Sequence, residues 1–203
     1  MKKMLILGSL LLMVSSVCFA APTLNGPTGL IEVPSSDSLQ GGEFDLALHH
    51  VYDTNVLTFS LGLTDSLEAG VSAWKIDEHD TRTGGFFKYT LIPESSRQIG
   101  LAIGGGAYSN YNSLFVVGSK YLSELGARSH FGFDTSGDGV FFAGLSKNLN
   151  TKSGYPKTIA MAELYGGDFN VGLRILLTND VNLDLSLIDL DEAMIGLGFH
   201  SSF

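Results

Sequence analysis

From residue 41 to its last residue, the chain is a succession of short segments in which apolar residues alternate with small or polar ones. In the segment 56–63, leucine or phenylalanine occupies every second position, opposite Thr58, Ser60 and Gly62. A period of two predicts a β-strand with one apolar face. Proline falls only ahead of these segments or between them, where it removes no hydrogen bond from a strand ladder. The pattern therefore predicts an all-β chain.

The alternation predicts about twelve strands, each of roughly eight to eleven residues, the length that a tilted strand needs to cross a bilayer. The predicted strands are 43–52, 56–63, 67–75, 84–91, 98–107, 113–121, 127–134, 140–147, 158–165, 169–177, 181–187 and 193–203. The segments 113–121 and 158–165 alternate poorly, so the count ranges from about ten to fourteen. Short connections such as 64–66 and 178–180 suit up-and-down hairpins. We expect a closed antiparallel transmembrane β-barrel at 41–203.

A soluble β-sandwich or a small soluble barrel would also alternate. In those folds the face opposite the apolar one needs lysine and glutamate to keep molecules apart in solution. Here that face is rich in glycine and serine, and only 16% of all residues are charged. After residue 20, no apolar run approaches the ~20 residues of a membrane helix, so a membrane crossing would have to use a closed barrel.

The N-terminus has the pattern of a secretory signal peptide. Lys2 and Lys3 precede an apolar stretch at 4–17, and small residues allow cleavage after Ala20. An uncleaved anchor is the alternative, and Cys18 lacks the Leu-x-small pattern of a lipidated cysteine. We expect a signal peptide at 1–20 for Sec-dependent secretion, a leader at 21–40 and the barrel at 41–203. Without the signal, 10 of the 12 basic residues face 21 acidic ones, which disfavours nucleic acid as a partner.

The C-terminal strand ends in an aromatic residue. Ile195, Leu197, Phe199 and Phe203 share one face, opposite glycine, histidine and serine. This ending resembles the last strand of bacterial outer-membrane β-barrels, in which the final aromatic residue is part of the assembly signal. The resemblance implies localisation in the outer membrane of a Gram-negative type of envelope, contact with outer-membrane lipid, and recognition of Phe199 and Phe203 by the barrel-assembly machinery.

The leader has a motif of its own. Gly29, Leu30 and Ile31 lie between Pro27 and Pro34, shortly before Gly42 and Phe44. The segment 24–44 resembles the start of YjbH-type outer-membrane proteins, which are associated with exopolysaccharide production. The resemblance implies polysaccharide or export partners. Two physical interpretations stay open: an apolar peg in the mouth of the barrel, or a disordered leader.

With the apolar face toward lipid, several charged residues face the interior. The candidate pore-lining residues are Glu68, Lys88, Arg128, His130, Arg174 and Asp184. They can pair to hold the barrel's shape, or they can set the selectivity of a narrow pore. One strand carries Gly100, Ala102, Gly104 and Gly106 on one face, which predicts an open path beside that wall.

No motif predicts a cofactor, a metal ion or catalysis. Residues 134–139 match the opening of a calcium loop, but the closing glutamate is replaced by Leu145. The five histidines lack ligand spacing, and no serine has a Gly-x-Ser-x-Gly context. The sequence thus favours a non-enzymatic outer-membrane barrel acting as a narrow passive channel. The alternatives are an accessory component of surface-polysaccharide export and, less favoured, a lipid-modifying enzyme that uses serine with histidine.

Overall fold

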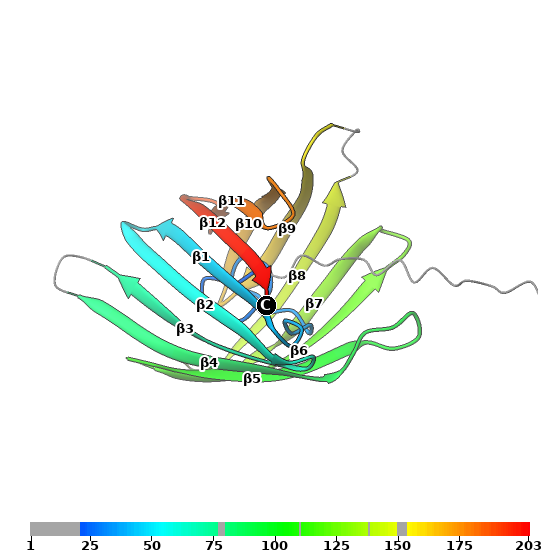
Figure 1. Ribbon diagram of the computed structural model, residues 1–203, viewed down its shortest axis with the longest axis horizontal. Helices are drawn as coiled ribbons and strands as arrows, with labels where there is room; N and C mark the ends of the chain where they lie inside the picture. Colours follow the sequence, from blue (N-terminus) through cyan, green and yellow to red (C-terminus); the bar gives the residue numbers. More distant parts are fainter. Residues whose placement is uncertain (1–20, 77–79, 110, 138, 150–153) are drawn as a thin grey trace, which may run out of the picture.

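Twelve antiparallel strands close into a barrel in the computed structural model (Figure 1). The structure describes residues 21–76, 80–109, 111–137, 139–149 and 154–203. The predicted signal peptide, His79 and one position of the calcium-like loop, Asp138, lie outside these ranges. The strands are β1 (Glu43–Val51), β2 (Thr54–Thr64), β3 (Leu67–Lys75), β4 (Thr81–Ile92), β5 (Gly100–Tyr108), β6 (Asn112–Leu122), β7 (Ala127–Asp134), β8 (Val140–Leu149), β9 (Lys157–Tyr165), β10 (Asp168–Leu176), β11 (Val181–Ile188) and β12 (Glu192–Ser202).

The strands pair in chain order, so the barrel is of the predicted up-and-down type. The last strand returns to the first: Glu43 pairs with Ser202, and His50 pairs with Ile195. This pairing gives β1 and β12 a partner on both sides and removes the sheet edge. The predicted fold class and strand number are confirmed.

Strand boundaries differ from the predicted ones by a few residues. β4 begins at Thr81 rather than at residue 84, since Thr81, Arg82 and Thr83 continue the ladder with β3 although their side chains are polar and exposed. The alternation of apolar residues detects only the part of a strand that presents an apolar face, whereas backbone pairing continues beyond it.

The two faces of the barrel wall are those expected from the sequence. Leu46, Leu57 and Leu185 point outward and are exposed, whereas Asp45, Thr58 and Ser186 on the same strands are buried inside. The outer surface is therefore a band of leucine, phenylalanine and valine, and the interior is polar. Across the described residues, no helix has the length and apolar character that crossing a membrane would require.

The poor alternation of β6 and β9 has a structural cause. Phe115 and Val117 of β6 point inward and are buried, as does Met161 of β9. These inward apolar side chains share clusters with the leader: Val33 belongs to the cluster of the first two, and Leu30 and Ile31 belong to the cluster of Met161. A strand that has apolar neighbours on both faces loses its period-two pattern.

The two ends of the barrel differ. The terminal end, as we call it, holds the start of β1 and the end of β12; among its fully described connections are 93–99, 123–126 and 177–180. The distal end is the opposite one, where β1, β3, β5, β7, β9 and β11 end; the connections 52–53, 166–167 and 189–191 lie there. Figure 1 shows the leader, in blue, inside the ring of strands.

Candidate functional site: the leader inside the barrel

The leader, residues 21–40, is a compact and largely buried insert. Ala21, Leu24, Ile31, Val33 and Leu39 are each less than a tenth exposed. The leader folds on itself through hydrogen bonds from Leu24 N to Ile31 O (2.8 Å) and from Leu30 N to Val33 O (2.9 Å). Of the two physical interpretations of the sequence, the structure has the ordered apolar peg, and it reaches well beyond the mouth of the barrel.

Glu68 and Lys88, from neighbouring positions on β3 and β4, hold the middle of the leader. Both side chains are 0% exposed, and Lys88 Nζ lies 3.2 Å from Glu68 Oε1. Lys88 Nζ donates to the carbonyl oxygen of Thr28 (2.7 Å), and Glu68 Oε2 accepts from the N–H of Leu39 (3.0 Å). Buried charges of opposite sign need such additional partners, because their mutual attraction alone rarely offsets the loss of hydration.

Glu163 of β9 binds three consecutive backbone N–H groups. Its carboxylate accepts from Ile31 (3.2 Å), Glu32 (2.8 Å) and Val33 (3.2 Å). Nδ2 of Asn170, on β10, donates to Glu163 at 3.1 Å and to Glu32 at 2.9 Å. Successive N–H groups around one anion form a nest, a geometry that binds carboxylates and phosphates in many proteins. Here the chain supplies both the nest and its anion.

Arg174 of β10 binds carbonyl groups of the leader backbone, whereas Glu163 binds N–H groups. Its guanidinium donates to the carbonyl oxygens of Gly29 (3.0 Å) and Leu30 (3.1 Å). The same group donates to Asp184 of β11 from Nε (2.9 Å) and Nη2 (2.9 Å). A planar guanidinium has enough fixed donors to bind a carboxylate and two carbonyls at once.

Arg128 of β7 anchors the part of the leader nearest the terminal end. Its guanidinium donates from Nη2 to Asp37 (2.9 Å) and from Nε to Glu94 (2.7 Å). Burial alone would raise the pKa of Asp37, but the hydrogen bond and the positive charge of Arg128 outweigh it and hold that pKa below its ordinary value. Asp37 is therefore a carboxylate at neutral pH.

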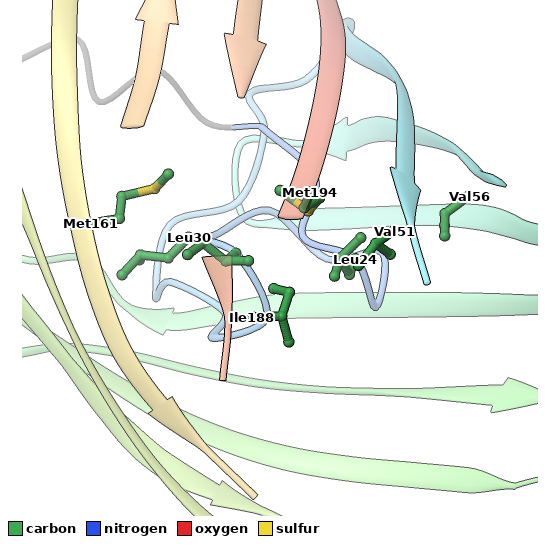
Figure 2. Close-up of a cluster of buried hydrophobic side chains, with 8 residues drawn as sticks. Leu24, Leu30, Val51, Val56, Met161, Ile188 and Met194 are labelled. Atoms are coloured by element: carbon green, nitrogen blue, oxygen red, sulfur yellow. The ribbon is translucent and has the colours of Figure 1, made fainter. Parts of the chain in front are cut away.

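Apolar contacts complete the attachment. Figure 2 shows Leu24 and Leu30 of the leader among Val51, Met161, Ile188 and Met194 of the barrel wall. A second cluster surrounds Val33, with Ala102, Phe115, Val117 and Phe142. The leader is thus held by charges that bind its backbone and by apolar clusters that bind its side chains.

The glycine-rich strand leaves no open path, contrary to the expectation from the sequence. A Cβ placed at Gly104 would lie 2.3 Å from the ring of Phe115, and one at Gly106 would lie 2.5 Å from the ring of Tyr108. At Gly100 the neighbour is the hydroxyl of Ser36, 2.4 Å away. Large side chains of the wall and the leader itself fill the volume that the glycines leave, and sequence spacing does not reveal this.

A serine–histidine contact exists, but it lies under the leader. Ser119 Oγ is 2.9 Å from His130 Nδ1, and both residues are buried. The N–H of Ser36 donates to the same Ser119 Oγ at 2.9 Å. With the leader in place, the leader backbone occupies the position from which a substrate would approach the hydroxyl. Among the described residues, no group of three or more His, Cys, Asp or Glu side chains is arranged to hold a metal ion.

All six candidate pore-lining residues point into the barrel. Four of them, Glu68, Lys88, Arg128 and Arg174, bind leader atoms directly, and Asp184 pairs with Arg174. His130 reaches the leader through Ser119. Sequence reasoning missed Glu163, Asp37 and Asn170. Glu163 falls on the inward face of β9 at two positions from Met161, but the poor alternation of that segment hid its direction. Asp37 was missed because no local pattern places a leader residue inside a barrel.

Solved structures with the same architecture are porins and related outer-membrane proteins. The chain is similar to the KdgM porin, with 12% identity over 79% of this chain and 99% of that one and a TM-score of 0.56. A structure of KdgM in complex with disordered oligogalacturonate has a TM-score of 0.55, at 11% identity over the same shares of the two chains. Omp33 of Acinetobacter baumannii has a TM-score of 0.52, at 10% identity over 81% of this chain and 100% of that one.

At these identities the likeness concerns the fold: a closed antiparallel barrel of the outer-membrane porin type. No protein-family model and no curated protein sequence matches the chain.

Proposed function

We propose that this chain is a non-enzymatic outer-membrane barrel that acts as a narrow passive channel, with the leader as an internal plug that closes it. The outward apolar band suits a bilayer, and the similar barrels named above are porins. In this proposal the signal peptide directs Sec-dependent secretion, and the barrel-assembly machinery inserts the barrel among outer-membrane lipids.

The observation that carries the proposal is how the leader is attached. Side chains of the wall bind its backbone through Glu68, Glu163, Lys88 and Arg174, and all of these contacts are non-covalent. The described leader residues pair only with one another as bridges and do not extend the barrel ladder. The plug can therefore leave without breaking the sheet. Its departure would expose a polar interior lined by Glu68, Lys88, Arg128, His130, Arg174 and Asp184, which charged solutes and water can cross.

A second candidate is an accessory role in surface-polysaccharide export. The burial of Leu30 and Ile31, from the motif that resembles YjbH-type proteins, favours it because a firmly seated leader suits a barrel that does not conduct. The two functions differ in one measurable property, which is ionic current through the purified barrel.

The test is single-channel recording with a reversible lock. A Ser36→Cys/Ser119→Cys variant is designed to join the leader to β6 at the place where Ser36 N and Ser119 Oγ are 2.9 Å apart; the proposed removal of the signal peptide takes away Cys18. We expect no current when the disulfide is formed and currents after reduction. Glu163→Gln, which weakens the nest, should raise the open probability. The single variant Ser36→Cys is the control and should respond to neither oxidant nor reductant.

Equal current in the locked and reduced states would refute the plug. No current in the reduced protein or in Glu163→Gln, together with lost surface polysaccharide in a deletion strain, would favour the accessory role. Hydrolysis of lipid by the purified barrel would refute both functions.

A further inference from the structure

At the distal end, the leader and the wall border a cavity of about 280 Å³. Leu24 and Asn25 of the leader form part of its floor, and residues of β2, β3 and β11, together with Tyr52 and Tyr111, form its walls. This volume is just below the roughly 300 Å³ at which ligand pockets begin. The cavity therefore has room for one small organic molecule.

Aromatic rings line one side of this cavity. Trp74, Tyr52 and Tyr111 all contribute to its surface. Trp74 is fixed by an edge contact with Tyr108 (ring centroids 5.3 Å apart), and Tyr108 stacks on Tyr111 at 4.7 Å. Rings held in this way present π-faces whose negative potential attracts cations, most strongly for tryptophan.

A carboxyl group completes the lining. Glu32 of the leader faces the cavity, and its Oε2 accepts from Asn170 at 2.9 Å. Burial is the main reason that the pKa of Glu32 is raised to about 7, and the negative charges of Glu163 and Asp168 near the same carboxyl add to the rise. Further acidic residues lie at this end of the barrel: Asp53, Asp189 and Asp191 in connections, and Asp168 and Glu192 as the first residues of β10 and β12.

Arg82 is a cation among the lining residues, but its charge is offset at the rim. Its Nη2 lies 3.4 Å from Oδ2 of Asp80, and both side chains are more than two-fifths exposed. The net character of the cavity is thus aromatic and acidic. A neutral polar ligand would leave the acidic potential unmatched, and an anion would be repelled by it.

We propose that the distal cavity binds a small organic cation, of the quaternary-ammonium or alkylamine class, over the ring of Trp74 and beside the carboxylate of Glu32. Aromatic rings supply the attraction for a weakly hydrated cation, and the carboxylate supplies the opposite charge. Because the docked leader forms part of the site, binding there requires the leader inside the barrel and does not require conduction.

The test uses Trp74 as its own reporter, because it is the single tryptophan of the chain. The purified mature protein in detergent micelles is titrated with choline at pH 8 while the tryptophan fluorescence is followed. The neutral molecule 3,3-dimethylbutan-1-ol, which has the shape of choline without its charge, is the matched ligand control. We expect saturable binding of choline and about tenfold weaker binding of the neutral molecule.

Glu32→Gln should weaken choline binding by about tenfold, whereas Glu124→Gln, in an exposed connection at the terminal end, should leave it unchanged. Calorimetry on Trp74→Leu supplies a second measurement that does not depend on fluorescence, and binding should be lost there. The proposal is overturned if choline shows no saturable binding by either method. Equal binding of the neutral molecule would overturn it as well. So would preferential binding of maltose, which represents a neutral polar ligand.

Discussion

Both carboxylate oxygens of Glu68 accept hydrogen bonds from Thr28, a residue 40 positions earlier in the chain. The N–H of Thr28 donates to Oε1 at 2.8 Å, and its hydroxyl donates to Oε2 at 2.7 Å. One residue of the leader thus binds both carboxylate oxygens of one residue of the wall. Because Lys88 binds the same threonine from the other side, the three groups fix the middle of the leader at one place inside the barrel.

Removing the charge of Glu68 should destabilise the protein strongly. Glu68→Gln leaves the fully buried ammonium of Lys88 without its nearest opposite charge, and uncompensated buried charges cost roughly 3–5 kcal/mol. Urea unfolding in lipid vesicles, followed by tryptophan fluorescence, measures the difference. The double variant Glu68→Gln/Lys88→Met should recover part of the loss. A loss in the double variant as large as in the single one would contradict the pairing.

An outward arginine should be costly in the middle of a strand and tolerated near its end. Leu185 is mid-strand on the outer face of β11, and Leu177 directly follows β10 at the terminal end; both are exposed outward. Leu185→Arg should cost about 2–4 kcal/mol in a bilayer and Leu177→Arg about 0–1 kcal/mol. Folding free energies in vesicles provide the measurement. Equal costs at the two positions would mean that the apolar band does not face lipid.

Ser186, the inward neighbour of Leu185, should not accept arginine freely, although the interior of the barrel is polar. Ser186 is 7% exposed, and its hydroxyl and Ile31 of the leader both lie close to Gly172. Ser186→Arg should displace the leader rather than enter a water-filled space. Faster proteolysis of the 21–40 segment in Ser186→Arg than in Ser186→Ala would reveal the displacement.

Phe203 should matter for assembly more than for stability. The residue is 87% exposed, its ring stacks on Phe44 with the centroids 5.6 Å apart, and its N–H donates to the carbonyl oxygen of Gly42 at 3.2 Å. Deleting Phe203 should reduce the heat-modifiable folded fraction recovered from cells severalfold, because the terminal strand closes the ladder. Deleting Tyr155, in an exposed connection, is the control. Similar yields for both deletions would argue against an assembly signal at Phe203.

The docking of the leader should weaken as the pH rises. Burial and Glu163 raise the pKa of Glu32 from 4.5 to about 7 in the docked leader, so docking favours the protonated form. The stabilisation by that proton is complete at low pH and is lost between pH 4.5 and 7, by on the order of 3 kcal/mol. Hydrogen exchange of the leader amides at pH 5.5 and 7.5, corrected for intrinsic rates, measures the change.

Glu32→Gln is the matched variant for this pH dependence, and it should flatten the profile. Glu163 and Asp168 are the titratable groups that act on the same carboxyl, so a profile that remains in Glu32→Gln would assign the titration to one of these two. Asp37 should act with the opposite sign, since its pKa is lowered and its ion pair with Arg128 is lost only at pH values below the ordinary range of an aspartate.

The sequence by itself determined the strands, their number and the faces of the wall. These properties are local: a period of two sets which side chains point outward, and short turns set which strands pair. The prediction weakened only at β6 and β9, where the inward residues Phe115, Val117 and Met161 are apolar. Their partners lie in the leader, far away in the sequence.

Only the tertiary structure decided where the leader lies and what the interior charges do. The N–H of Ile31 meets a carboxylate 132 positions away, and Arg174 meets the carbonyl of Gly29 across 145 positions. Backbone groups of a leader carry no sequence signature of their own, so nothing in the residue order indicates that Glu68, Glu163 and Arg174 bind them. The closed ring of strands brings these side chains into one interior. The leader is stable there because its apolar residues are buried and its backbone groups form hydrogen bonds.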